Sequence, residues 1–289
     1  MISAPNRRGI ALMTAAMACY VLNDTLVKLT LQTFPAGQVL TLRSLMSTVM
    51  LGVISWRHLA TAGAVRTLMR PVLALRCALE VTTAVTSVLA LTHASLATVS
   101  AIMMTAPLLI IATSVTLGWE RARPRLLLSV AVGLAGALLV LRPTPLSSGE
   151  GLALACLCAV SLAARDLITR RLPSTMPSAL VAALTTGSVC VAGPVFGWAR
   201  AESWVSLARP ETITVAAAAL CAAVGNYALV AACRGVDLSV VTPFRYSLVV
   251  WACLIAFLVW GDVPDASHAT GIAVIVVAGV LTLHAAGRR

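Results

Sequence analysis

The sequence predicts an all-α integral membrane protein with ten transmembrane helices, arranged as two inverted five-helix repeats. Three observations support this fold class. Of the 289 residues, 60% are hydrophobic and only 11% are charged, whereas about 25% of the residues of soluble proteins are charged. Apolar runs long enough to cross a bilayer recur along the chain. The third observation is a duplication: GIALMTAAMACYVLNDTLVKLTLQTFP begins at Gly9, and the similar GLALACLCAVSLAARDLITRRLPSTMP begins at Gly151.

The ten predicted spans follow from the thickness of the bilayer. Its hydrocarbon core of about 30 Å requires about 20 mostly apolar residues, because a helix rises 1.5 Å per residue. The connections are short, rich in proline, and too short to hold a soluble domain. The predicted spans lie near residues 9–30, 36–56, 71–92, 95–118, 126–141, 150–170, 178–198, 212–233, 238–260 and 269–285.

The duplication defines two domains. Asp24 and Asp166 occupy equivalent positions in the two copies (166 − 24 = 142), and the same offset relates Leu96–Glu120 to Leu238–Asp262. We therefore predict a first five-helix repeat over residues 1–145 and a second over residues 146–289. An odd number of helices per repeat forces the second copy to enter the membrane from the opposite side, as in many secondary transporters.

The basic residues predict the orientation of the chain. Lys and Arg concentrate in the cytoplasmic connections of membrane proteins. Thirteen of them lie at one set of predicted span ends and four at the opposite set, so we expect both termini in the cytoplasm. The thirteen are Arg7, Arg8, Arg57, Arg66, Arg70, Arg121, Arg123, Arg125, Arg170, Arg171, Arg234, Arg288 and Arg289, and the four are Lys28, Arg142, Arg200 and Arg209.

The composition also excludes several kinds of site. A net charge of +11 could indicate a nucleic-acid partner, but aromatic residues make up only 4% of the chain and the basic residues lie between apolar runs. Nucleic-acid binding requires a solvated basic face, usually with aromatic side chains that stack on bases. The eight cysteines lie inside apolar segments and the four histidines show no ligand spacing. We therefore expect no nucleic-acid partner, no metal and no cofactor.

Ionisable residues inside the spans are the candidates for a functional site. Each costs a few kcal/mol within a bilayer, so each requires a partner or a function. Glu80 lies near the centre of the third span, with Arg76 one turn before it. The two residues can form a structural pair within one helix. Alternatively, Glu80 can face a cavity, where it would bind a substrate amine or carry a proton.

The eighth and ninth spans add further polar groups near the same depth. Arg245 can hold a substrate carboxylate with two parallel hydrogen bonds, or it can neutralise Glu80 across the bundle. The amide of Asn226 adds hydrogen-bonding groups, and neighbouring aromatic and methionine side chains could complete the lining. The predicted substrate-binding residues are Glu80, Arg245, Tyr227, Asn226, Tyr246, Arg76, Met103 and Trp251.

The two acids of the duplicated helix are predicted gates. Asp24 lies about 22 Å along the first span, and Asp166 lies at the mirrored depth of the sixth. They can act as gating or proton-linked acids at opposite mouths of a pathway, together with their neighbours Asn23 and Arg165. The alternative is that each anchors a helix end through an ion pair one turn away, Asp24 with Lys28 and Asp166 with Arg170.

Small residues on two helices predict close packing. Gly193 and Gly197 lie four positions apart in the seventh span, as do Gly133 and Ala137 in the fifth. Such small faces allow helices to approach closely. We expect them to join helices within the chain, which would be a monomer or a weak homodimer.

Several motifs, in this order, resemble the EamA family of the drug/metabolite transporter superfamily. They are Gly9, Met13, Asp24 and Lys28 in the first span, Arg43 in the second, Thr105-Ala106-Pro107-Leu108, and Gly118-Trp119-Glu120. The resemblance covers nearly the whole chain in both repeats. It implies a ten-helix carrier of small metabolites in the bacterial inner membrane. One departure is Asp262, where the family usually has Glu.

The resemblance also implies the function. We expect a secondary transporter, not an enzyme, that exports amino acids or related compounds by alternating access, driven by protons or a counter-substrate. The segment from Asp166 to Arg171 resembles the branch that carries riboflavin, S-adenosylmethionine and metallophores. An uptake carrier or exchanger for such compounds is therefore the alternative. A membrane enzyme is a remote alternative, since no catalytic motif is present, and so is a non-transporting subunit, which would not explain the ionisable groups within the bilayer. No nucleotide-binding GxxxxGK[ST] sequence is present, so transport would use a gradient or exchange.

Overall fold

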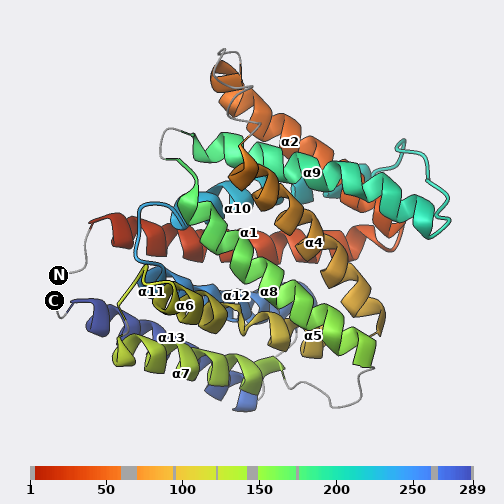
Figure 1. The fold of residues 1–289 in the computed structure, drawn as a ribbon. Helices are drawn as coiled ribbons and strands as arrows, with labels where there is room; N and C mark the ends of the chain where they lie inside the picture. The colour runs from red at the N-terminus through yellow and green to blue at the C-terminus, as the bar shows by residue number, and fades with distance from the viewer. Residues whose placement is uncertain are drawn as a thin grey trace.

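The computed structural model describes residues 4–59, 70–93, 96–121, 123–141, 149–173, 176–261 and 266–287, and the regular elements in these ranges are all helices (Figure 1). The predicted domain boundary between residues 145 and 146 lies outside the described residues, as do Asp262 and four of the arginines that predict the orientation, Arg66, Arg142, Arg288 and Arg289. The helices are α1 (Ala4–Thr30), α2 (Ala36–Leu59), α4 (Pro71–His93), α5 (Leu96–Met103), α6 (Ala106–Thr116), α7 (Pro124–Leu141), α8 (Gly149–Arg171), α9 (Ser178–Ala199), α10 (Thr212–Ala232), α11 (Leu238–Val241), the 3₁₀-helix η1 (Thr242–Tyr246), α12 (Ser247–Trp260) and α13 (Ala266–Gly287).

Most of these helices are suited to a membrane. Eight described segments are long and apolar enough to cross a bilayer, and Ala266–Thr282 within α13 is a shorter apolar helix. The eight segments include Val99–Thr116, which joins α5 and α6, and Leu238–Val259, which joins α11, η1 and α12. The structure thus supports a multi-pass membrane protein and matches the predicted count of ten spans in part.

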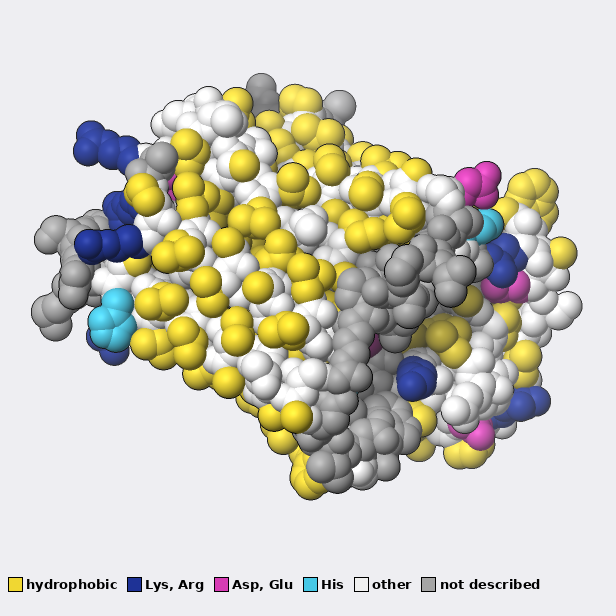
Figure 2. All heavy atoms as spheres, turned by 90° about the horizontal axis from the view of Figure 1, so that it is seen from below, with side chains coloured by type: hydrophobic (Ala, Val, Ile, Leu, Met, Phe, Trp, Pro, Cys, Tyr) yellow, Lys and Arg dark blue, Asp and Glu magenta, His cyan; other side chains and the backbone are white. Residues whose placement is uncertain are grey.

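The surface agrees with this assignment. Figure 2 shows hydrophobic side chains over the middle of the molecule, with Lys and Arg gathered at one end and charges of both signs at the other. Large apolar side chains on α9 and α10 are exposed, among them Val191 and Ile213, which are 72% and 75% accessible. Large exposed apolar surfaces are typical of proteins that contact a membrane or a partner, and the length of the apolar helices favours a membrane.

The fourth and ninth predicted spans are interrupted, although the sequence predicted each as one continuous helix. The first interruption separates α5 from α6, and Pro107 lies in the first turn of α6. In the second, η1 separates α11 from α12, and Pro243 lies in the first turn of η1. Proline cannot donate the backbone hydrogen bond that would continue the preceding helix. The second halves, α6 and α12, begin at nearly equivalent positions of the two repeats.

Helices of the two repeats pair with each other in a symmetric pattern. The most extensive pairs are α2 with α9, α1 with α10, α7 with α13, and α4 with α8. Exchanging the repeats turns the α1–α10 pair into the α8–α4 pair, and leaves the α2–α9 and α7–α13 pairs unchanged. The same exchange relates the packing of α1 on η1 and α12 to that of α8 on α5 and α6. The contacts therefore reveal an approximate two-fold relation between the repeats.

The duplicated helices run in opposite directions. Near its beginning, α1 contacts the start of α11 through Asn6, whose side chain donates to Asp237 (3.0 Å). Near its end, α8 reaches the same place through Arg170, which pairs with Glu120, and Glu120 in turn accepts from the N–H of Leu238. The start of α1 and the end of α8 thus lie at one end of the bundle (Figure 1). This is the geometry of an inverted repeat.

The small residues lie in contacts within the chain. A Cβ atom added at Gly193 of α9 would lie 3.0 Å from the backbone N of Thr41 on α2. One added at Gly136 of α7 would lie 2.8 Å from the backbone O of Gly271 on α13. In these two helix pairs, glycine is required because the backbones approach too closely for any side chain.

Candidate functional site

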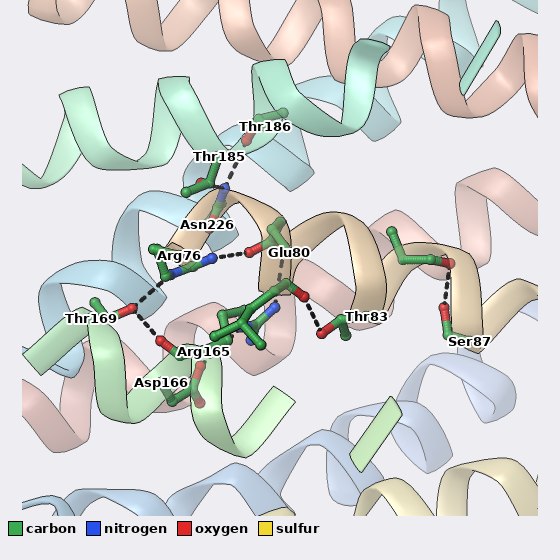
Figure 3. Close-up of polar contacts among 12 residues, drawn as sticks. Arg76, Glu80, Thr83, Ser87, Arg165, Asp166, Thr169, Thr185, Thr186 and Asn226 are labelled. Atoms are coloured by element: carbon green, nitrogen blue, oxygen red, sulfur yellow. Dashed lines mark hydrogen bonds and ion pairs between the residues drawn. The ribbon is translucent and has the colours of Figure 1, made fainter. Parts of the chain in front are cut away.

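Five charged side chains from α4, α8 and η1 form a continuous network, and Figure 3 shows four of them, Arg76, Glu80, Arg165 and Asp166. Helix α4 contributes Arg76 and Glu80, which lie one turn apart on one helix face. The Arg76 Nη1 atom lies 2.5 Å from Glu80 Oε2. The other carboxylate oxygen of Glu80 lies 3.2 Å from Nη1 of Arg165, on α8. Glu80 therefore joins the first repeat to the second.

The network continues through Asp166 to the interruption of the ninth span. Asp166 Oδ1 accepts from Nε of Arg165 at 3.0 Å. Its second oxygen, Oδ2, forms an ion pair with Arg245 of η1. The order of contacts is thus Arg76, Glu80, Arg165, Asp166 and Arg245, and they come from α4, α8 and η1.

The network is buried and carries an excess of positive charge. The side chains of Arg76, Arg165, Asp166 and Arg245 are 1%, 6%, 2% and 6% exposed, and Glu80 is the most accessible at 16%. Three guanidinium groups face two carboxylates, which leaves one positive charge unbalanced. Removing charges from water is costly even when they are paired. A buried network of this size therefore indicates a function.

Polar neighbours orient the arginines. Thr169, on α8, accepts a hydrogen bond from Arg76 Nε (2.7 Å) and donates one to the backbone carbonyl of Arg165 (2.8 Å). Within the described part of the chain, Nη2 of Arg76 is buried and has no hydrogen-bond partner. One strong donor of the network is thus available for a further acceptor.

A second polar cluster lies on α1 and α2. Arg43 Nη1 donates to Oδ1 of Asn23 (3.0 Å), and the Asn23 amide donates to Asp24 Oδ1 (2.8 Å). Asp24 is exposed, unlike its repeat equivalent Asp166. Arg43 lies close enough to Glu80 for the charges of the two side chains to influence each other. The second cluster and the central network therefore lie within electrostatic range of each other.

The other predicted substrate-binding residues lie outside these two clusters. Asn226 donates to Thr186 on α9 (2.7 Å), and Tyr227, the next residue on α10, is 39% exposed on a different face. Tyr246 is 1% exposed and its ring lies against Gly133. The side chains of Met103 and Trp251 pack beside the apolar core that α1, α6, α8 and α10 share.

Two of the alternative pairings differ from those predicted. The sequence suggested that Asp166 pairs with Arg170, but Asp166 pairs with Arg165 and Arg245, and Arg170 pairs with Glu120 (2.5 Å). It also suggested that Arg245 neutralises Glu80, whereas Arg245 binds Asp166. Spacing along one helix cannot reveal a partner on another helix, so it could not show that Arg245 of η1 pairs with Asp166 of α8.

Sequence reasoning missed Thr169 and the pair of Glu120 and Arg170. Thr169 lies one turn after Arg165 on the same face of α8, so helical spacing could have identified it. Glu120 was noted only as the end of a repeated motif, and nothing in its local sequence indicates its partner. Among the described residues, no three His, Cys, Asp or Glu side chains are grouped as a metal site.

Comparison with known proteins identifies relatives of this architecture. The model of the EamA-like transporter family matches the chain twice, over residues 7–142 and 149–284. No curated protein matches the sequence. One solved structure, titled only as the crystal structure of a protein, matches with a TM-score of 0.80 and 19% identity, over 97% of this chain and 98% of that chain. At that identity, the likeness shows a shared fold.

Proposed function

Because this chain belongs to the EamA-like transporter family, we propose that it is a secondary transporter that moves a small polar metabolite across the bacterial inner membrane by alternating access. The observation that carries the proposal is the buried network of Arg76, Glu80, Arg165, Asp166 and Arg245. It links the two repeats beside an interrupted helix, the usual position of a substrate site in transporters built from inverted repeats.

We infer ten spans with both termini in the cytoplasm. Helix α4 is 23 residues long and α13 is 22, and each is long enough to cross a bilayer as a tilted helix. Together with the eight apolar segments, they complete the count. The start of α1 and the end of α13 lie at the same end of the bundle, as an even number of spans requires (Figure 1). The positive-inside rule assigns that end to the cytoplasm.

The charge of the network favours substrates that carry a carboxylate. One arginine charge is unbalanced, and Nη2 of Arg76 has no partner within the described structure. A guanidinium binds a carboxylate through charge-assisted hydrogen bonds, while the more accessible Glu80 could hold an amine. Export of amino acids or related compounds fits this arrangement. A net cation such as S-adenosylmethionine would add to the positive charge, so its carriage, like that of riboflavin, is the second choice.

The test is flux through the purified protein in liposomes. We expect counterflow of labelled amino acids, weaker or no counterflow of S-adenosylmethionine and riboflavin, and loss of flux when the substrate carboxylate is esterified. Glu80→Gln should reduce flux at least about tenfold or change its pH dependence, since a charge-assisted hydrogen bond contributes about 1.5–3 kcal/mol. Glu150→Gln, at an acid that is 81% exposed at the start of α8, is the matched control.

Three results would contradict the whole proposal or a part of it. An absence of flux for every compound, including under an imposed pH gradient, would count against a carrier. Unchanged flux and pH dependence in Glu80→Gln would remove Glu80 from the transport site. Preferential flux of S-adenosylmethionine or riboflavin would replace amino acid export with the alternative substrates.

A further inference from the structure

The carboxylate of Glu120 joins three segments at one end of the bundle. It follows the end of α6, and its Oε1 atom lies 2.5 Å from Nη1 of Arg170, near the end of α8. The same carboxylate accepts hydrogen bonds from the backbone N–H groups of Leu238 (2.7 Å) and Ser239 (3.1 Å) in α11. The Glu120 side chain is only 7% exposed. One acid therefore holds together chain segments that belong to both repeats.

The turn that carries Glu120 is itself fixed. Gly118 has a φ of +67°, which a residue with a side chain rarely adopts. The N–H groups of Trp119 and Glu120 both donate to the carbonyl of Ser114 in α6. The guanidinium of Arg171 lies 3.8 Å above the centre of the Trp119 ring, within range of a cation–π interaction. The end of α8 is thus held by two neighbouring contacts to one rigid turn.

Two acids that the duplication makes equivalent differ in exposure. Asp166 and Asp24 are equivalent in the two repeats, yet Asp166 is 2% exposed whereas Asp24 is exposed. Arg170 lies one turn beyond Asp166 on α8, so the Glu120 contacts lie between the network and this end of the bundle. Carriers with inverted repeats alternate between a conformation that is open at one end and a conformation that is open at the other.

We propose that Glu120 is a gate residue, which holds this end of the pathway closed by clamping α8 and α11 to the end of α6. Its contacts must break when the network becomes accessible from this side. The role in a transport cycle rests on the proposed function, but the closure itself does not. Glu120 acts on access to the network through Arg170 and the backbone of α11, without contacting the substrate.

Cys233 provides a native reporter of the gate. It lies at the end of α10, is 1% exposed, and packs in the same apolar cluster as Leu238. Opening at this end would expose its thiol. The background for the experiment retains Cys233 alone and replaces with alanine Cys19, Cys77, Cys156, Cys158, Cys190, Cys221 and Cys253.

The experiment measures the rate at which a charged, membrane-impermeant methanethiosulfonate labels Cys233 in inside-out vesicles. Glu120→Gln should raise this rate about tenfold or more, the factor that corresponds to about 1.4 kcal/mol. Arg170→Gln, which keeps the acceptors for Leu238 and Ser239, should raise it less. Labelling should be slow in right-side-out vesicles, and the reverse sidedness would overturn the predicted orientation.

The matched control is Glu202→Gln. Glu202 also binds a backbone N–H group, that of Gly37 at the start of α2 (2.8 Å), but at the opposite end of the bundle. A merely structural role for Glu120 predicts that both variants lower the melting temperature while Cys233 stays protected. Only a gate predicts faster labelling in Glu120→Gln alone.

The labelling rates of the variants decide whether Glu120 is a gate residue. Equal labelling in Glu120→Gln and the background protein would overturn the gate, as would equally fast labelling in Glu202→Gln. If Glu120→Gln does not fold, Arg170→Gln must show faster labelling for the proposal to stand. If the gate responds as expected but no compound is transported in liposomes, the proposed function fails and the gate remains.

Discussion

At the scale of single residues, the unequal environments of two equivalent acids give the sharpest contrast. Asp166 accepts a hydrogen bond from Arg165, forms an ion pair with Arg245, and is 2% exposed. Asp24 is exposed and accepts a hydrogen bond from the neutral amide of Asn23. A buried carboxylate between cations stabilises the fold only while its partners remain charged and close. Asp166 should therefore matter to folding far more than its repeat equivalent.

Asp166→Asn is expected to destabilise the protein strongly. It leaves Arg165 and Arg245 with reduced compensation in a buried site, and loss of one partner from a buried ion pair costs about 3–5 kcal/mol. Asp24→Asn, the matched control at the exposed position, should cost about 1 kcal/mol or less. Thermal unfolding in detergent measures both. Equal shifts of the melting temperature in the two variants would show that the network contributes little to stability.

The sequence allowed the network members to be predicted but not their contacts. Glu80, Arg76, Arg165, Asp166 and Arg245 were all candidates, because ionisable residues inside apolar spans are few and costly. The exchange of partners between Asp166, Arg245, Arg170 and Glu120 depends on how helices of different repeats face one another. Helical spacing gives neighbours within one helix only, so these partners required the fold.

At the scale of elements, close packing of α2 on α9 explains why glycine recurs on α9. The Cβ atom that Gly193 lacks would meet the backbone of Thr41. The hydroxyl of Thr41 donates to the carbonyl of Gly37 on its own helix (2.7 Å), so it offers no unsatisfied group at the contact. The α2–α9 pair is thus held by close approach of backbones rather than by interlocking large side chains.

Gly193→Leu should force α2 and α9 apart. Overpacking of a tight contact costs about 1–3 kcal/mol or more, so we expect a lower melting temperature and a lower yield of folded protein. Gly52→Leu is the matched control, since a Cβ atom at Gly52 of α2 would meet nothing within 4 Å. The measurement is the monodisperse fraction on size-exclusion chromatography after heating. Similar losses in both variants would contradict the packing argument.

The element boundaries were predictable except at the two interruptions. Apolar length identified the spans, but α5 and α6 form one apolar run, as do η1 and α12. A hydropathy pattern does not register a local change of hydrogen bonding within such a run. Pro107 and Pro243 were the available signals, and they mark the start of α6 and the first turn of η1.

At the scale of the whole molecule, the two-fold relation could be inferred from the offset of 142 residues and the odd number of helices per repeat. The contact pattern and the opposed directions of α1 and α8 agree with it. Symmetry could not reveal the difference between the two ends. That difference arises from residues that the repeats do not share, such as Glu80, whose equivalent is Ala222, and Arg245, whose equivalent is Met103.

The unbalanced positive charge of the network has a consequence for energetics in a cell. One elementary charge that crosses a membrane potential of 100 mV gains or loses about 2.3 kcal/mol. A substrate with one net negative charge would neutralise the network, so voltage would then act on the empty carrier. A zwitterionic substrate would leave the loaded carrier charged as well.

Voltage dependence should therefore distinguish these two classes of substrate. For a monoanion, an imposed potential should change net efflux severalfold and leave one-for-one exchange unchanged, because exchange uses only the loaded, neutral form. For a zwitterion, the imposed potential should change the rate of one-for-one exchange as well. Liposomes with potassium gradients and valinomycin set the potential for both measurements. If the net efflux of a monoanion does not change with the imposed potential, the arginine charge does not move within the electric field.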